Sequence, residues 1–166
     1  MKRLLLPLAA ALCACSEPKA GLPAEGASLI ESLSIAEAVS GTSHWRLKAR
    51  SARMEEKKGV IFFASPAVKF YDGEKVTSEI TSLKGEILMR EKEAELTGSV
   101  KINAVKDGML LATERLFYSS ARNKIWTQEK ITIHKGNTVI TGRGFTANPD
   151  LSEIEIKNQE TRMAGK

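Results

Sequence analysis

The chain has 166 residues, of which 27% are charged and only 5% are aromatic, and its formal net charge is +5. Two of the basic side chains, Lys2 and Arg3, belong to an N-terminal signal, and without them 23 basic residues stand against 20 acidic ones. So small an excess, with no block rich in lysine and arginine, excludes a nucleic-acid-binding class, and we expect no nucleic acid among the partners.

The N-terminal residues have the pattern of an export signal. Met1-Lys2-Arg3 is a basic start, and the apolar run Leu4–Leu12 is far shorter than the roughly 20 residues of a membrane-spanning helix. The residues Leu12-Cys13-Ala14-Cys15 resemble a bacterial lipobox, in which a small residue precedes the cysteine that becomes the lipidated N-terminus. The resemblance implies a lipoprotein signal peptide over residues 1–14 and lipidation of Cys15 by chains such as palmitate. An ordinary secretory signal is the alternative.

Lipidation would leave the mature protein without a free thiol, because Cys13 leaves with the signal and Cys15 forms a thioether. Each buried methylene of an attached chain contributes about 0.8 kcal/mol, so several chains hold a protein on a membrane. Residues 15–28 are rich in proline, glycine and alanine without a periodic apolar pattern, which predicts a lipid anchor followed by a flexible linker.

The segment Ser28–Val39 fits a helical face as well as a strand. We favour a strand, because Ser40-Gly41-Thr42 is a turn signal and His44–Arg50 behind it alternates cleanly as the returning arm of a hairpin. The helix is the alternative.

Short runs that alternate between apolar and polar residues follow, separated by turn signals such as Asp72-Gly73, Asp107-Gly108 and Gly136-Asn137. They predict strands over residues 60–64, 68–71, 76–80, 87–89, 93–102, 111–118, 125–127, 131–133, 139–145 and 151–157. About a dozen short strands without intervening helices indicate an all-β sandwich, barrel or roll and exclude a parallel α/β fold. We therefore predict one β-domain over residues 29–160 and a C-terminal tail over residues 161–166.

Several strand motifs follow one another in a set order. They are Trp45-Arg46-Leu47-Lys48-Ala49, Pro66-Ala67-Val68-Lys69-Phe70-Tyr71, Leu96-Thr97-Gly98-Ser99-Val100-Lys101-Ile102, Leu111-Ala112-Thr113-Glu114, the later Thr127, Ile131 and Ile133, and Gly142-Arg143-Gly144. Taken together, these motifs resemble the LptC family over roughly Leu33–Ile156. The resemblance implies a twisted open β-jelly roll, in which two antiparallel sheets enclose an apolar groove. It also implies a non-catalytic bridge that receives lipopolysaccharide from inner-membrane ABC transporter subunits and passes it to the next periplasmic β-jelly-roll protein.

The N-terminus departs from the pattern of this family. Many members begin with an uncleaved transmembrane helix, and here a lipid on Cys15 would replace it. The family role implies an anchor on the periplasmic face of the inner membrane. Ser16, directly after the lipidated cysteine, is a residue that permits outer-membrane sorting in enteric bacteria, so the outer membrane is the alternative location.

Strand alternation places aliphatic and aromatic side chains on one face of each strand, which predicts an apolar interior. Within the resemblance, this interior is where the acyl chains of lipid A would bind. The candidate groove residues are Trp45, Leu47, Val68, Phe70, Ile80, Leu96, Val100, Ile102, Leu111, Tyr118, Ile131, Ile133 and Phe145. Alternation cannot separate lipid contact from core filling, so an envelope lipoprotein that acts as a β-scaffold without a lipid ligand is the second hypothesis.

The first and last predicted strands would lie at the two ends of the roll if strand order follows chain order. Unpaired edge strands can pair with another chain. We expect the N-terminal edge to meet the transporter and the C-terminal edge to pair with the downstream export protein. The predicted edge residues are Leu151, Glu153, Ile154, Glu155 and Ile156.

No group of residues indicates catalysis, a metal or a cofactor. The two histidines, His44 and His134, have no cysteine or histidine at metal-ligand spacing. Glu91, Glu93 and Glu95 alternate along one strand, which is typical of a solvated strand face. We therefore expect a protein that is not an enzyme.

Overall fold

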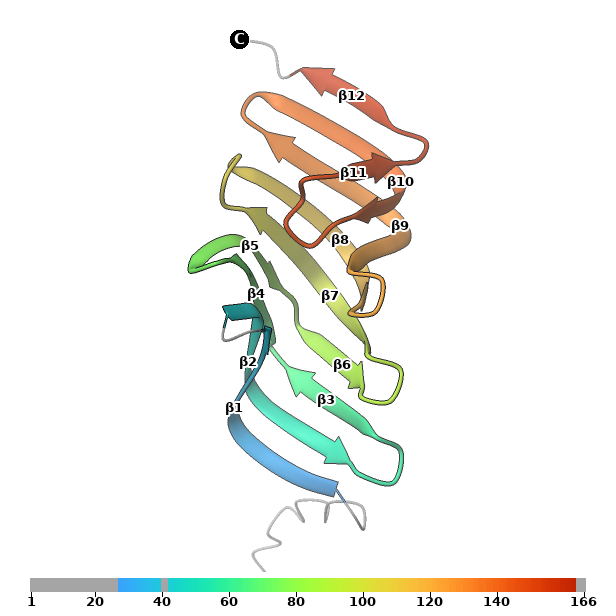
Figure 1. Ribbon diagram of the computed structural model, residues 1–166. Helices are drawn as coiled ribbons and strands as arrows, with labels where there is room; N and C mark the ends of the chain where they lie inside the picture. The colour runs from blue at the N-terminus through green and yellow to red at the C-terminus, as the bar shows by residue number, and fades with distance from the viewer. Residues whose placement is uncertain (1–26, 40–41, 164–166) are drawn as a thin grey trace, which may run out of the picture.

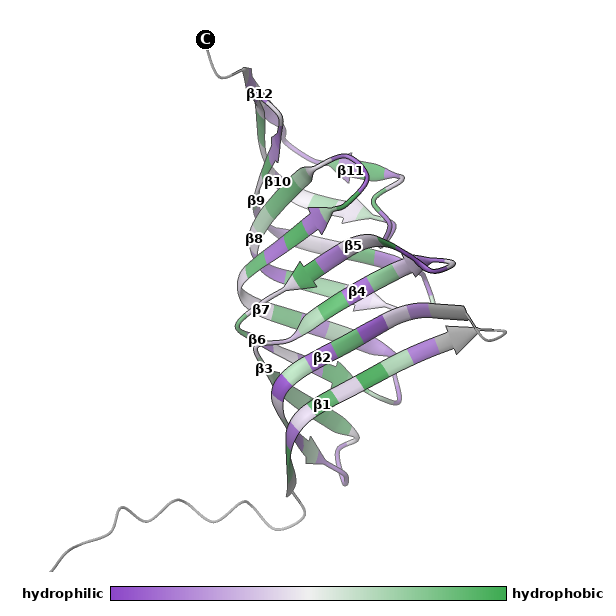
Figure 2. Ribbon diagram, turned by 90° about the vertical axis from the view of Figure 1, so that its left-hand side faces the viewer, coloured by the Kyte–Doolittle hydropathy of each residue, from purple (hydrophilic) through white to green (hydrophobic). Residues whose placement is uncertain are grey.

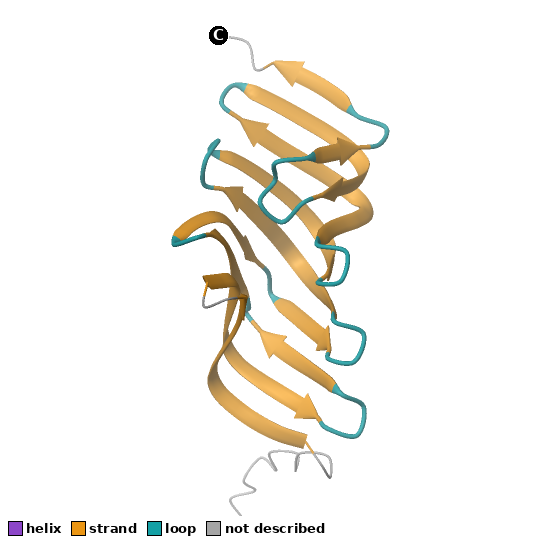
Figure 3. Ribbon diagram, in the orientation of Figure 1, coloured by secondary structure: helices purple, strands orange, loops and turns teal. Residues whose placement is uncertain are grey.

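The computed structural model describes residues 27–39 and 42–163, and its regular structure there is entirely β (Figure 1; Figure 3). No helix within these residues is long and apolar enough to cross a membrane. The strands are β1 (Ala27–Val39), β2 (Thr42–Glu55), β3 (Val60–Ala64), β4 (Ala67–Asp72), β5 (Lys75–Thr81), β6 (Lys84–Leu88), β7 (Glu93–Ala104), β8 (Met109–Ser119), β9 (Lys124–Lys135), β10 (Thr138–Ala147), β11 (Ile154–Ile156) and β12 (Glu160–Met163).

All strand pairs are antiparallel, and they form one continuous hydrogen-bonded sheet in the described part of the chain. β3 and β4 lie end to end along β2, pairing with its C-terminal and N-terminal halves respectively. β6 and β5 lie along the two halves of β7 in the same way. The topology is therefore a meander of long strands, two of which are interrupted halfway.

The interruptions lie at one level of the sheet. Ser65 donates its backbone N–H to the Leu83 carbonyl, and Leu83 donates to the Gly98 carbonyl, so three neighbouring strands are irregular side by side. Ser65, Gly98 and Ser99 all have positive φ, which bends a strand sharply. Ser32 of β1 also has positive φ at this level.

These bends fold the sheet into two facing layers. One layer contains β3, β6 and β11 with the adjoining halves of β2, β7, β8, β9 and β10, and we call it the β3–β6 layer. The other contains β4, β5 and β12 with the remaining halves, and we call it the β4–β5 layer. The predicted jelly roll of antiparallel strands is confirmed.

The core lies between the two layers. Alternate residues of β2 and β4 point into it, and Figure 2 shows the resulting bands of apolar and polar residues along these strands. The most completely buried side chains come from both layers, and each is at most 2% exposed. They include Ile80, Val100, Ile102, Leu111, Leu116, Ile125, Ile131, Ile133 and Phe145.

The C-terminal edge is built from two short strands. β11 pairs with the end of β10 at Phe145–Ala147, and β12 pairs with its beginning at Thr138–Thr141. Between them the chain passes so close to Gly142 that a Cβ atom there would lie 2.5 Å from Ile156 Cγ2. Residue 142 is therefore a glycine because a side chain there would clash with Ile156 and approach the Lys157 carbonyl to 3.1 Å.

Three details differ from the sequence predictions. The strand expected over residues 151–157 comprises only Ile154–Ile156, because Leu151 adopts a positive φ of 59° in the turn before it. The expected tail begins inside β12, which runs to Met163. The two strands expected over 125–127 and 131–133 form one strand, β9. The strand favoured for residues 28–39 is confirmed as β1, whereas two residues of the expected turn, 40 and 41, lie outside the described residues.

Candidate functional site

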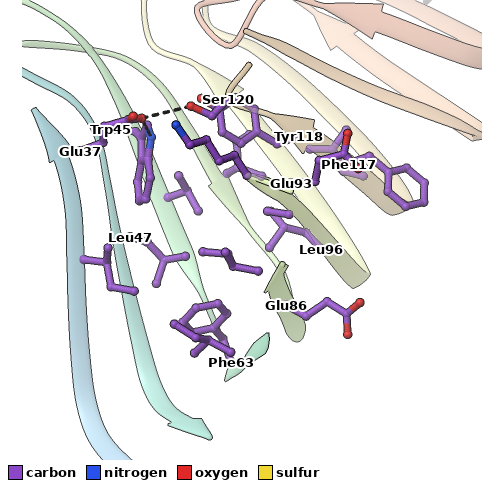
Figure 4. Close-up of a pocket in the computed structure, with 18 of the residues that line it drawn as sticks. Glu37, Trp45, Leu47, Phe63, Glu86, Glu93, Leu96, Phe117, Tyr118 and Ser120 are labelled. Atoms are coloured by element: carbon purple, nitrogen blue, oxygen red, sulfur yellow. Dashed lines mark hydrogen bonds between the residues drawn. The ribbon is translucent and has the colours of Figure 1, made fainter. Parts of the chain in front are cut away.

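An apolar cavity of about 300 Å³ lies between the two layers, in the half of the roll formed by β1 to β8 (Figure 4). β1, β2, β4 and β5 contribute one side, and β3, β6, β7 and β8 contribute the other. The aliphatic and aromatic side chains that line it include Ile35, Leu47, Ile61, Phe63, Val68, Phe70, Ile80, Ile87, Leu96 and Leu116.

The turn between β6 and β7, with the strand residues beside it, forms part of the rim of the cavity. Met89 and Lys92 belong to the turn between β6 and β7 and are exposed, and Glu86 and Glu93 flank this turn. The turn is tied to the one after β8, because Ser120 donates its backbone N–H to the Lys92 carbonyl at 3.0 Å. The cavity thus has an apolar interior and a charged rim.

Glu37 connects the two layers across the cavity mouth. The carboxylate accepts a hydrogen bond of 2.5 Å from the Trp45 indole N–H and one of 3.4 Å from the Ser120 hydroxyl (Figure 4). Glu37 lies on β1, whereas Ser120 follows β8 in the opposite layer. We call these three residues the Glu37 clasp.

An aromatic pair lies next to the clasp. The rings of Phe70 on β4 and Tyr118 on β8 meet edge to face, with centroids 5.5 Å apart and planes at 67°. Burial raises the pKa of the Tyr118 phenol, and the nearby Glu37 carboxylate raises it further, while a hydrogen bond with Ser120 acts in the opposite direction. The phenol therefore stays neutral at physiological pH.

Outside the cavity the interior is filled. Six inward side chains of β7, β8, β9 and β10 are at most 2% exposed and do not line the cavity: Val100, Ile102, Leu111, Ile131, Ile133 and Phe145. The apolar interior therefore consists of a cavity in the part formed by β1 to β8 and a packed core formed by these six residues of β7 to β10.

The predicted groove residues divide along the same line. Seven of them line the cavity: Trp45, Leu47, Val68, Phe70, Ile80, Leu96 and Tyr118. The remaining six are the core residues of β7 to β10. Both groups alternate identically along their strands, so the sequence carries no signal that separates them.

Sequence reasoning missed several lining residues. Ile61 and Phe63 lie in the apolar run Val60–Ala64, where the absence of polar neighbours hides which side chains point inward. The sequence could have indicated Glu37, because it follows Leu33 and Ile35 at alternate positions of β1 and therefore points inward with them. A carboxylate in an apolar phase needs polar partners, which Trp45 and Ser120 provide.

The predicted edge residues lie in and before β11. Ile154 is 37% exposed, and Glu153 forms an ion pair of 3.2 Å with Lys124. Leu151 instead turns inward and packs against the core. Among the described residues, histidine, cysteine, aspartate and glutamate form no group of three or more that could hold a metal ion.

The comparisons with known proteins agree with this architecture. The structure is similar to a crystal structure of LptH, described as the LptA homologous periplasmic component of the conserved lipopolysaccharide transport device from Pseudomonas aeruginosa. The TM-score is 0.55 at 11% identity, and the match covers 72% of this chain and 94% of LptH, which shows a shared fold. No curated protein matches the sequence.

A family model extends over nearly the whole chain. The model described as "Lipopolysaccharide-assembly, LptC-related" matches residues 14–163. The family comprises non-enzymatic transport proteins of the periplasm and cell envelope. The chain therefore belongs to the LptC-related family of lipopolysaccharide-assembly proteins.

Proposed function

We propose that this protein holds acyl chains of lipopolysaccharide in the cavity between its layers while it bridges an inner-membrane ABC transporter and the next periplasmic β-jelly-roll protein. The observation that carries the proposal is the cavity itself. Its interior is lined by aliphatic and aromatic side chains, and its charged groups lie at the rim.

The physical properties of the cavity suit an acyl chain. An interior lined by aliphatic and aromatic side chains offers few directional contacts, so affinity comes from removing methylenes from water, at about 0.8 kcal/mol each. A volume of about 300 Å³ lies at the lower end of the range for ligand sites. The cavity therefore takes part of a lipid and leaves the polar headgroup at the rim, a binding mode strong enough to hold a chain and weak enough to release it.

The two ends of the sheet support the role as a bridge. β1 pairs only with β2 among the described residues, so its other edge is free, and β11 and β12 form the opposite end of the roll (Figure 1). We propose that β1 meets the transporter and that the C-terminal edge accepts a strand from the downstream protein. A lipid on Cys15, which lies outside the described residues, would hold the domain at the periplasmic face of the inner membrane.

Site-specific photo-crosslinking in lipopolysaccharide-producing cells tests the binding site. A photoreactive side chain at Leu96, which lines the cavity, is expected to crosslink lipopolysaccharide. Val100 is the matched control, because it faces inward from the same strand but lies in the packed core. Lys101, on the outer face, is expected to give no crosslink. Crosslinks from Lys101 instead of Leu96 would reverse the assignment of the inner face.

The second candidate function is an interaction scaffold that takes up no lipid. The long free edge of β1 favours it, because such an edge suffices for docking to another envelope protein. Protein purified from membranes distinguishes the two functions. Co-purifying lipopolysaccharide supports the bridge, whereas repeated purification without it, in the presence of bound envelope proteins, supports the scaffold.

A further inference from the structure

We propose that Glu37 recognises a hydrogen-bond donor on the bound lipid, a hydroxyl or an amide N–H close to the head of an acyl chain. The cavity therefore prefers acyl chains that carry such a donor over chains that lack it. The inference rests on the proposed function, because it concerns the same cavity. It adds a polar contact that selects among acyl chains.

The side chain of Glu37 faces the cavity at its mouth. Ile35 and Glu37 occupy alternate positions of β1, and both line the cavity. Their partners on β2 are Leu47 and Trp45, which line it as well. Side chains of directly paired residues lie on the same face of a sheet. Glu37 thus places a carboxylate beside the aliphatic and aromatic side chains of the interior.

This carboxylate has acceptor capacity to spare. An ionised carboxylate can accept about four hydrogen bonds, shared between its two oxygens. Trp45 and Ser120 both donate to the same oxygen, Oε2. Among the side chains that the structure describes, none forms a hydrogen bond or an ion pair with the other oxygen, Oε1. Oε1 is therefore available to a donor on a ligand in the cavity.

The other charged groups that line the cavity do not suit this role. The Glu93 carboxylate forms an ion pair of 3.2 Å with Arg122. Glu86 lies at the rim and points away from the apolar interior (Figure 4). Lys92 carries donors and no acceptor, so it suits an anionic group on the ligand. Glu37 is therefore the carboxylate that a donor on the ligand meets at the mouth.

A contact with Glu37 has a measurable effect on affinity. A hydrogen bond to a charged acceptor raises affinity about tenfold. The gain belongs to the pair formed by the ligand donor and the carboxylate, so it disappears when either partner is removed. An anionic group at the same position would be repelled, so the preferred donor is a neutral one.

Calorimetric titration with two matched pairs of neutral lipids measures this preference. N-methyldecanamide carries an N–H that N,N-dimethyldecanamide lacks, and methyl β-hydroxydecanoate carries a hydroxyl that methyl decanoate lacks. The full chain is used with Cys15→Ser, so that no attached lipid competes. The ratio of affinities within each pair, donor over non-donor, is then compared between protein variants. This comparison cancels the difference in hydrophobicity between the two ligands of a pair.

Glu37→Gln is expected to lower this ratio about tenfold. The carboxamide oxygen can still accept from Trp45 and Ser120, whereas the carboxamide nitrogen only donates, so the Glu37 clasp stays and the spare acceptor is lost. Glu93→Gln is the matched control, because the Glu93 carboxylate lines the same cavity but is already paired with Arg122. It should leave the ratio unchanged.

Circular dichroism checks that Glu37→Gln folds. If it does not, nuclear Overhauser contacts in the Cys15→Ser protein take its place. The N–H proton of bound N-methyldecanamide should contact the Trp45 indole N–H, which donates to the same carboxylate. Contacts of this proton with Met89, at the rim in the opposite layer, would instead overturn the inference.

The outcomes separate this inference from the proposed function. If the protein binds none of the four ligands, the proposed function fails and the inference fails with it. If it binds them with ratios that Glu37→Gln leaves unchanged, the cavity holds acyl chains but Glu37 does not select among them. An equal fall of the ratio in Glu93→Gln would also overturn the inference, because it would reflect lost charge at the rim. A fall in one pair alone supports the inference and identifies the recognised donor as the hydroxyl or the amide.

Discussion

The Ser78 hydroxyl donates a buried hydrogen bond of 2.5 Å to the Pro149 carbonyl, although the two residues lie 71 positions apart. Ser78 belongs to β5, and Pro149 follows β10, which ends in the opposite layer. The bond therefore joins the two layers at the C-terminal half of the roll, where the interior is packed. The Glu37 clasp joins the same two layers beside the cavity.

Ser78→Ala should destabilise the fold by about 1–3 kcal/mol, because it leaves the Pro149 carbonyl without its donor in a buried position. Urea unfolding measures the change. Ser82→Ala is the control, since the Ser82 hydroxyl bonds only to the Lys84 carbonyl two residues away, and a loss of less than about 1 kcal/mol is expected. Equal losses in both variants would show that the bond between the layers contributes no more to the free energy of unfolding than the local bond of Ser82.

The sequence predicts the strands better than it predicts the shape of the interior. Alternation along β7 correctly places Leu96, Val100 and Ile102 on one buried face. It does not show that Leu96 lines a cavity whereas Val100 is packed in the core, because that depends on how the two layers face each other. Contacts between distant strands depend on where the sheet bends, and period-two patterning carries no such information.

The bends themselves were only partly visible in the sequence. Gly98 and Pro66 are residues that commonly interrupt strands, and both lie at the bend. Ser32, Ser65 and Ser99 adopt positive φ without being glycine, and no local pattern indicates it. Leu151 is a similar case, and its positive φ explains why the last predicted strand begins later than expected.

Gly142→Ala should disrupt the C-terminal edge, because the added Cβ would lie 2.5 Å from Ile156 Cγ2. We expect a loss of about 1–3 kcal/mol in the free energy of unfolding. The double variant Gly142→Ala, Ile156→Ala should lose less than the sum of the single variants, because the shorter side chain removes the clash. Strictly additive losses would place the cost elsewhere, for example at the Lys157 carbonyl, 3.1 Å from the same Cβ position.

Alkaline pH should weaken the fold through Tyr118. Its pKa is raised by burial, so the folded protein holds the phenol proton more firmly than the unfolded chain, in which tyrosine titrates near pH ~10. The resulting stability is fully present below that pH and is lost as pH rises through the raised pKa of the folded state. Tyr118→Phe should therefore flatten the fall in melting temperature at alkaline pH. Tyr71→Phe is the control, since Tyr71 lies outside the cavity lining beside Arg46, and an identical effect in both variants would contradict the assignment.

Cys15→Ser should block lipid attachment and signal cleavage, whereas Cys13→Ser should block neither. The reason is the lipobox pattern, in which Ala14 rather than Leu12 precedes the modified cysteine. Mass spectrometry of the mature N-terminus measures both effects. An unmodified Cys15 in the native protein, or a mature chain that starts elsewhere, would show that the protein is not a lipoprotein of this kind.

The C-terminal edge is expected to bind the downstream export protein, and truncation tests this orientation. Cutting after Asn148 would remove Pro149 and with it the bond from Ser78, so a loss of binding could reflect unfolding. Truncation after Lys157 is sharper, because it removes β12 and retains β11, Pro149 and the contact of Ile156 with Gly142. It exposes the edge of β10 at Thr138–Thr141, which β12 covers in the full chain.

Three results of that truncation are informative. If β12 supplies the docking edge, the truncated protein should lose the downstream partner in a pull-down and keep the transporter, because β1 lies at the other end of the roll. If β12 instead shields β10, the truncated protein should bind the downstream partner more tightly, through the newly exposed edge. Unchanged binding to the downstream partner, together with loss of the transporter, would reverse the proposed orientation of the bridge.

Charge substitutions at Ser34 and Ala36, on the outward face of β1, then test the transporter side independently of the C-terminus.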